Sequence, residues 1–301
     1  MAEGVGPSTK SFVDSCLSKF RYLRVLDLSG SSFEVLSSSI GTMKHLRLLD
    51  LSDNCRIHKL PNSICKLQNL QTLGLRGCEK LEELPKDIRY LIRLRTFLMT
   101  TKQKCLPGFS NSLQSLGLFN CGNLESLVEM MQVCTSLRVL IIDNCGGLIS
   151  LLPTLKFHTT LEALIIQNCE KLDLTEIEDD QDDFPTSLRV LGFIGLPQLV
   201  AMPDWIKPSA KSLQILIIEN CPNLTALPEW LVNLESLRRL TILNCPILSS
   251  LSKEKICLPT VRSFIIAECH ELIRRCQPEI GEDWHKIAHA SEIYLDYKQI
   301  K

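Results

Sequence analysis

The sequence lacks the features that would place it in several large classes of protein. It has no apolar run near the roughly 18 residues that a membrane-spanning helix needs. Neither sign of charge is in excess, because the net charge is −1, whereas nucleic-acid-binding proteins usually carry a basic surface. The first ten residues are polar and contain glycine and proline, unlike a secretory signal. We therefore expect a cytoplasmic chain that neither inserts into membranes nor binds nucleic acid.

Motifs for catalysis and cofactor binding are missing as well. The sequence has no G-x-x-x-x-G-K-[ST] phosphate loop and no clear set of nucleophile, base and orienting acid. His285 and His289 lie near Cys269 and Cys276, but their spacing does not match a zinc-binding pattern. We expect no enzymatic activity, no cofactor and no bound metal.

Cysteine, in contrast, is abundant, with 14 residues dispersed along the chain. Without an expected secretory signal, dispersed cysteines indicate reduced thiols and not a disulfide framework. Seven of them recur three residues after a repeated apolar pattern: Cys78, Cys121, Cys145, Cys169, Cys221, Cys245 and Cys269. Asn54 takes this place in an earlier copy. A thiol is a small, weak donor that tolerates burial, so these cysteines are predicted to form a structural ladder.

The repeated pattern is L-x-x-L-x-L, and its commonest offset is 24 residues. Eleven copies begin at Leu23, Leu46, Leu70, Leu94, Leu113, Leu137, Leu161, Leu188, Leu213, Leu237 and Val261. A period of this length is typical of leucine-rich repeats, in which each L-x-L segment is a short strand. The predicted fold is an α/β solenoid, a leucine-rich-repeat horseshoe with a parallel concave sheet and short helices or 3-10 turns on the convex side.

Three parts of the chain follow from this periodicity. Residues 1–22 are an expected N-terminal segment with an incomplete cap made by Phe12, Cys16, Leu17 and Phe20, residues 23–280 hold the repeats, and residues 281–301 form a half-repeat and cap. Pro61, Pro85 and Pro228 each precede apolar residues at every third position. This spacing favours short helices or 3-10 turns that begin near the proline.

Two repeated phrases resemble a known family. The phrase L-x-I-x-N-C-P-x-L occurs at Leu216–Leu224 and Leu240–Leu248, and L-P-x-x-I-x-x-L occurs at Leu60–Leu67 and Leu84–Leu91. Both resemble the repeat domain of plant intracellular immune receptors, the nucleotide-binding leucine-rich-repeat proteins. The resemblance spans the chain from about Phe12 to about Leu295.

The tail Gly281–His289 is similar to the phrase that closes this domain in the coiled-coil, RGA-like subclass, which usually has proline where His285 stands. The resemblance implies a ligand-sensing and autoinhibitory domain. Its partners would be a pathogen effector, or a host protein that the effector modifies, and the nucleotide-binding domain of the same receptor. Since the family's phosphate loop is missing, the chain is expected to be a fragment or truncated form.

An apolar stripe is expected on the concave face, formed by residues between or beside the core positions. Its members are Leu98, Phe119, Val139, Ile141, Ile165, Val190, Ile194, Ile215, Ile217, Leu243 and Ile265. Exposed apolar stripes usually mark partner-binding sites. The alternative is that isoleucine and valine occur here because they favour strands.

A column of arginines follows the first leucine of many copies, and we include Arg138, Arg189, Arg238 and Arg262 in the candidate partner-binding surface. Guanidinium groups grip carboxylates, although such residues can also be solvated charges whose stems cover apolar surface. An acidic run between Glu176 and Asp183 is a further candidate for docking or a solvated loop.

Two alternative functions remain at this stage. An intracellular scaffold or adaptor would need a recruitment motif, and none is visible. An extracellular receptor or inhibitor domain would usually carry several glycosylation sequons, whereas Asn223–Thr225 is the one we find.

Overall fold

The computed structural model describes residues 15, 19–31, 34–156, 158–174, 184–251 and 258–301. The expected N-terminal cap residues Phe12, Cys16 and Leu17 and the acidic run lie outside the described residues. The chain divides into two compact units. The N-terminal unit comprises Met1–Leu137 and Ile141–Leu148, and the C-terminal unit comprises Arg138–Leu140 and Ile149–Lys301.

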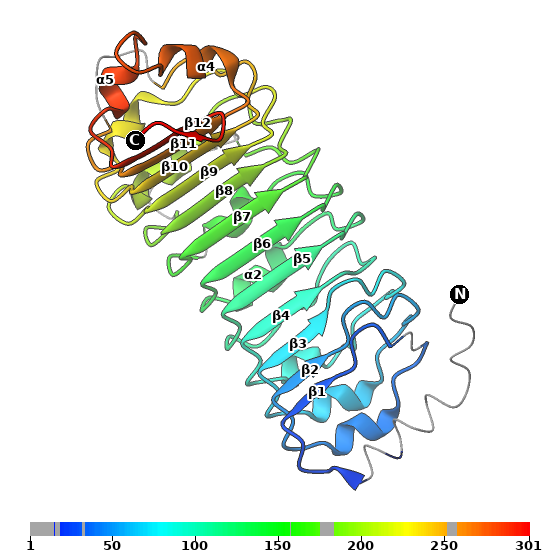
Figure 1. Ribbon diagram of the computed structural model, residues 1–301. Coiled ribbons are helices and arrows are strands. Elements are labelled where there is room, and N and C mark those ends of the chain that lie inside the picture. The colour runs from blue at the N-terminus through cyan, green and yellow to red at the C-terminus, as the bar shows by residue number, and fades with distance from the viewer. Residues whose placement is uncertain (1–14, 16–18, 32–33, 157, 175–183, 252–257) are drawn as a thin grey trace, which may run out of the picture. The chain divides into compact units, whose positions relative to one another are not determined.

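The N-terminal unit contains a parallel sheet in which each strand pairs with the next one along the chain (Figure 1). Its strands are β1 (Val25–Asp27), β2 (Leu48–Asp50), β3 (Thr72–Leu75), β4 (Thr96–Met99) and β5 (Ser115–Phe119). Its short helices are η1 (Ser38–Thr42), η2 (Asn62–Lys66), η3 (Ile88–Tyr90) and α2 (Val128–Val133). The residues of β6 (Val139–Asp143) are divided between the two units.

The C-terminal unit continues the same plan and ends differently. Its parallel strands are β7 (Ala163–Gln167), β8 (Val190–Ile194), β9 (Ile215–Glu219), β10 (Arg239–Leu243), β11 (Ser263–Ala267) and β12 (Glu292–Leu295). The last strand, β13 (Lys298–Gln299), pairs antiparallel with β12, which the repeat pattern does not predict. Its helices are α3 (Leu152–Leu155), η5 (Asp204–Ser209), η6 (Glu229–Asn233), α4 (His270–Arg275) and α5 (Trp284–Ile287).

The repeated apolar positions form the core, as the sequence predicts. Register places residues with the same repeat position side by side, so that Leu191, Leu216, Leu240, Phe264 and Ile293 form one buried row in the C-terminal unit. Burying a side chain of this size contributes about 1.5–3 kcal/mol. Repetition of such rows identifies each unit as an α/β solenoid.

The return segments contain 3-10 helices, as their apolar spacing predicts. Pro61 and Pro228 occupy the position just before η2 and η6, not the first helical turn. Each carbonyl accepts the first N–H bond of its helix, from Ile64 at 3.0 Å and from Leu231 at 3.1 Å. The fixed φ of proline therefore sets the direction in which the chain enters the helix.

The cysteine ladder has the structural role that its spacing predicts. All seven ladder cysteines are buried. The Cys78 thiol donates to the Leu51 carbonyl at 3.2 Å, and the Asn54 side-chain amide donates to the same carbonyl at 2.9 Å. Asparagine precedes many of these cysteines in the left-handed region, as at Asn120 and Asn220, with φ of 53° and 51°. Asparagine tolerates that conformation better than most residues.

A buried ion cluster closes the C-terminal unit. The Asp283 carboxylate is 1% exposed and pairs with Lys286 at 2.8 Å and Arg275 at 3.1 Å. Its Oδ2 also accepts the N–H of Leu251 at 3.4 Å. Burial by itself raises the pKa of Asp283, but the hydrogen bonds from Arg275 and Lys286 outweigh it and hold the pKa below its ordinary value. The Gly281–His289 phrase, which contains α5, is thus joined to α4 by this ion cluster.

Candidate protein-interaction surface

The face of the C-terminal sheet that points away from the core carries an apolar row along its centre. Register aligns Ile165, Gly192, Ile217, Thr241, Ile265 and Tyr294 on β7 to β12. Ile165, Ile217 and Ile265 are half-buried, and Thr241 between two of them is 9% exposed. In the C-terminal unit the central row of the expected stripe therefore contains three half-buried isoleucines, separated from one another by Gly192 and Thr241.

Two flanking rows widen this apolar surface. Val190 and Ile215 are neighbours two residues before the central row, whereas Ile194 and Leu243 lie two residues after it, with Glu219 between them. All four are half-buried. We call the surface made by Ile165, Val190, Ile194, Ile215, Ile217, Leu243 and Ile265 the outer-face patch.

The remaining members of the predicted stripe have different surroundings. Val139 and Ile141 are half-buried on β6, where the two units divide. Phe119 in the N-terminal unit is 8% exposed, so the expectation of an exposed ring there is wrong. The Arg76 guanidinium lies 4.3 Å from the centre of this ring and covers it. Gly117 leaves the room on β5 that the ring fills.

The central row on the outer face of the N-terminal sheet contains aspartate and glycine, with the half-buried Leu98 as its one large apolar member. Asp27 and Asp50 occupy the central row on β1 and β2, and the side chain of Asp50 lies over Gly74 on β3. Each aspartate accepts the N–H of the serine two residues later at 2.9 Å. The hydrogen bond from Ser29 holds the pKa of Asp27 below its ordinary value. Each carboxylate is therefore hydrogen-bonded to the backbone just after its own strand.

The arginine column runs along the entry to the strands, as expected, but other residues interrupt it. In the C-terminal unit the order is Arg138, Glu162, Arg189, Gln214, Arg238 and Arg262, because backbone hydrogen bonds join each position to the next. Arg138 forms an ion pair with Glu162 at 3.5 Å. Arg189, Arg238 and Arg262 are exposed. The column thus contains one neutralised arginine and one adjacent pair of arginines.

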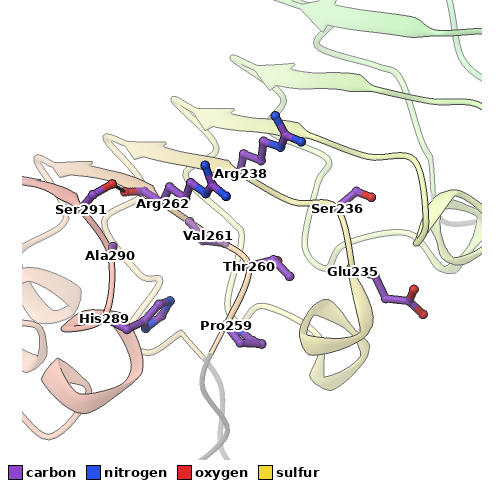
Figure 2. Close-up of a pocket in the computed structure, with 10 residues that line it drawn as sticks. All are labelled: Glu235, Ser236, Arg238, Pro259, Thr260, Val261, Arg262, His289, Ala290 and Ser291. Carbon is purple, nitrogen blue, oxygen red and sulfur yellow. Dashed lines mark hydrogen bonds between the residues drawn. The ribbon is translucent and has the colours of Figure 1, made fainter.

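The Arg238–Arg262 pair lines a depression of about 610 Å³ beside β10 and β11. Figure 2 shows the two side chains extending in the same direction, with Glu235 pointing away from them. The other lining residues are Ser236, Pro259, Thr260, Val261, His289, Ala290 and Ser291. Sequence reasoning missed this depression because His289 comes from the segment after α5, outside the repeat pattern.

The described part of the chain has neither a helix that could span a membrane nor a metal-binding cluster. No helix there combines the length and the apolar character needed to cross a bilayer. The same residues contain no group of three or more histidine, cysteine or acidic side chains placed to hold a metal ion.

Comparison with known proteins agrees with the repeat geometry. The family model described as a leucine-rich repeat region matches residues 6–261. The chain belongs to the leucine-rich-repeat family. Among solved structures of this fold, the leucine-rich-repeat domain of the type III effector XopL superimposes with a TM-score of 0.57 at 21% identity, covering 83% of this chain and 79% of that one.

Plant disease-resistance proteins share sequence with these leucine-rich repeats. TMV resistance protein N of Nicotiana glutinosa is 41% identical over 73 residues, which are 24% of this chain and 6% of that protein. Disease resistance RPP13-like protein 4 of Arabidopsis thaliana is 30% identical over 125 residues, 40% of this chain and 12% of that protein. The chain therefore matches a small part of the length of these relatives.

Proposed function

We propose that the chain is the ligand-sensing and autoinhibitory region of a plant disease-resistance receptor and acts in the cytoplasm. Its ligand would be a pathogen effector or a host protein that the effector modifies. The similarity to disease-resistance proteins supports the defence role. The outer-face patch is the observation that carries the binding role, because a group of apolar side chains on the outer face of a solenoid sheet is suited to a protein partner.

Autoinhibition is the second half of the proposal. The same chain would contact the nucleotide-binding domain of its own receptor and keep that domain inactive. The most direct test is co-purification of this chain with that domain. The three central isoleucines would be changed together in one variant, Ile165→Asp, Ile217→Asp and Ile265→Asp.

A control variant carries the same kind of substitution, isoleucine to aspartate, at exposed positions outside the patch. Ile149 and Ile247 are 61% and 49% exposed and belong to the C-terminal unit, outside its strands. Ile149→Asp with Ile247→Asp therefore adds the same kind of charge away from the patch. Circular dichroism would establish that both variants fold.

Each result of this experiment has a defined meaning. If association is lost only in the patch variant, the patch lies in the autoinhibitory interface. If association survives in both, autoinhibition uses another surface and the patch is available for a ligand. If the unmodified chain does not associate, the receptor proposal is contradicted and an intracellular scaffold becomes the better interpretation.

A further inference from the structure

Arg238 and Arg262 are direct neighbours at the entry to two adjacent strands, β10 and β11. Each precedes its strand by one residue, and the N–H of Arg262 donates to the carbonyl of Arg238 at 2.8 Å. Neighbouring strands lie roughly 4.8 Å apart, so the two guanidinium groups start from closely spaced points. Like charges placed directly opposite each other on a sheet are unfavourable.

Neither guanidinium is neutralised within the described residues. No carboxylate among them forms an ion pair with Arg238 or Arg262, although the pocket wall contains one acid, Glu235. Arg138, earlier in the same column, has such a partner in Glu162. The chain itself thus shows that a glutamate from the neighbouring position fits an arginine of this column.

The hydroxyl groups of the pocket are already committed as donors. Thr260 donates to the Leu234 carbonyl at 3.0 Å, Ser291 to the Arg262 carbonyl at 3.1 Å, and Ser236 to the Lys211 carbonyl at 2.6 Å. The remaining side-chain donors of the pocket are the His289 imidazole and the two guanidinium groups, each of which has five N–H bonds in a planar fork. That fork matches a carboxylate in a bidentate arrangement.

The arginine pair adjoins the outer-face patch. Arg239, the residue after Arg238, is exposed and lies between Ile215 and Ser263 in the flanking row of the sheet. A partner seated on the patch would consequently extend over a basic border at β10 and β11. A partner with apolar side chains alone would leave these charges unpaired at the edge of the interface.

We infer that Arg238 and Arg262 anchor carboxylates of an acidic and partly apolar protein segment that binds the outer-face patch. The inference rests on the proposed function and adds the chemistry of its partner. Arg238 and Arg262 hold the acidic side chains, and the patch receives the apolar ones. The inferred partner is a protein and not a lipid or nucleic acid, since the basic border continues directly into an apolar sheet face.

A random peptide library displayed on phage tests this inference without a known partner. The 301-residue chain would be panned beside three variants. One carries Arg238→Gln with Arg262→Gln, one carries Ile217→Asp, and the matched control carries Arg47→Gln with Arg95→Gln. Arg47 and Arg95 hold the same exposed column position in the N-terminal unit.

We expect the unmodified chain and the Arg47/Arg95 control to enrich peptides that combine aspartate or glutamate with apolar residues. The Arg238/Arg262 variant should lose the acidic preference and keep the apolar one. Synthetic peptides from the enriched set should bind it about tenfold more weakly by fluorescence anisotropy, since a charged hydrogen bond contributes about one such factor. Changing their acidic residues to amides should cost the unmodified chain a similar factor.

Other outcomes overturn the inference. Enriched peptides without an acidic preference would refute the anchor but leave the patch as a binding surface. An acidic preference that persists in the Arg238/Arg262 variant would also refute it. Failure of the unmodified chain to enrich any sequence would do the same. If Ile217→Asp leaves the enriched peptides unchanged while the Arg238/Arg262 variant alters them, the outer-face patch is not part of the binding site, although an anion site at the arginines exists.

Discussion

The two units use the same repeat positions for their cores and differ on the outer faces of their sheets. In the N-terminal unit the central row contains Asp27, Asp50, Gly74, Leu98 and Gly117, so that one of its five members has a large apolar side chain. In the C-terminal unit the equivalent row is built around isoleucine, and basic residues border it. Because the core positions are alike, this difference is not required by the fold. Outward positions are where a repeat protein acquires its partners.

The largest expected effect concerns the ion cluster that only the C-terminal unit possesses within the described residues. Asp283→Ala should destabilise that unit by about 3–5 kcal/mol, because it leaves Lys286 and Arg275 without their buried partner. Hydrogen exchange should show faster opening of β11 and β12, with β1 to β4 unaffected. Glu271→Ala removes an exposed partner of Arg274 and serves as the control, with a far smaller effect. Equal protection in both variants would contradict the prediction.

The same cluster makes a pH prediction with a defined sign. The folded-state pKa of Asp283 lies below the value of about 3.9 that the unfolded chain has. Its stabilising contribution is therefore present above about pH 4 and is lost as the pH falls through the folded-state pKa. In urea unfolding at several pH values, the stability gap between the unmodified chain and Asp283→Asn should narrow below about pH 4. A gap that widens there would reverse the assignment.

The reactivity of cysteine thiols should also differ strongly between the two units. The exposed cysteines Cys55 and Cys105 belong to the N-terminal unit, whereas every described cysteine of the C-terminal unit is buried. Burial raises the pKa of Cys78 to about 11 and that of Cys276 to about 12. A rise of about two units lowers the reactive thiolate population about a hundredfold.

Native alkylation with iodoacetamide, followed by peptide mass spectrometry, measures this difference. Cys55 and Cys105 should react at least about a hundredfold faster than Cys78 or Cys276. All four should react alike in concentrated urea, which controls for the reagent. Fast labelling of Cys276 in the folded protein would show that the segment around the end of α4 opens readily.

Two glycines at equivalent positions should respond to alanine with opposite signs. A Cβ at Gly117 would lie 2.6 Å from Cε2 of Phe119 and 2.8 Å from Cδ2 of Leu98. A Cβ at Gly192 would lie 3.5 Å from Ile165, an ordinary contact. We expect Gly117→Ala to cost about 1–3 kcal/mol through crowding, and Gly192→Ala to gain up to about 1 kcal/mol. Denaturant unfolding decides, and a loss of stability in both would contradict the comparison.

The repeat pattern was sufficient to predict the architecture and the rows of the candidate surface. Strands that stack in register bring residues at equal repeat positions together, so Ile217 and Ile265 could be assigned to one row from their spacing alone. The burial of Cys221 and Cys245 followed from the same logic.

Features that depend on neighbouring side chains could not be predicted in this way. Phe119 is buried because Gly117 leaves room and Arg76 reaches across, which no single repeat reveals. The Asp283 cluster joins residues as distant as Leu251, and its partners come from outside the strands. The interruption of the arginine column was visible in principle, because Glu162 and Gln214 stand at the aligned positions.

The smallest expected effect distinguishes the neutralised arginine from the adjacent pair. Arg138→Gln removes an ion pair whose arginine side chain is 61% exposed and should cost at most about 0.5 kcal/mol. Arg238→Gln removes a like-charge neighbour of Arg262 and should gain a few tenths of a kcal/mol, about the reverse. Replicate urea unfolding at low salt would resolve the opposite signs, and high salt should remove both effects because surface charges are then screened. A loss of stability in Arg238→Gln that persists at high salt would mean that this side chain supports the fold through packing. That result would contradict the interpretation of Arg238 and Arg262 as two unneutralised charges available to a partner.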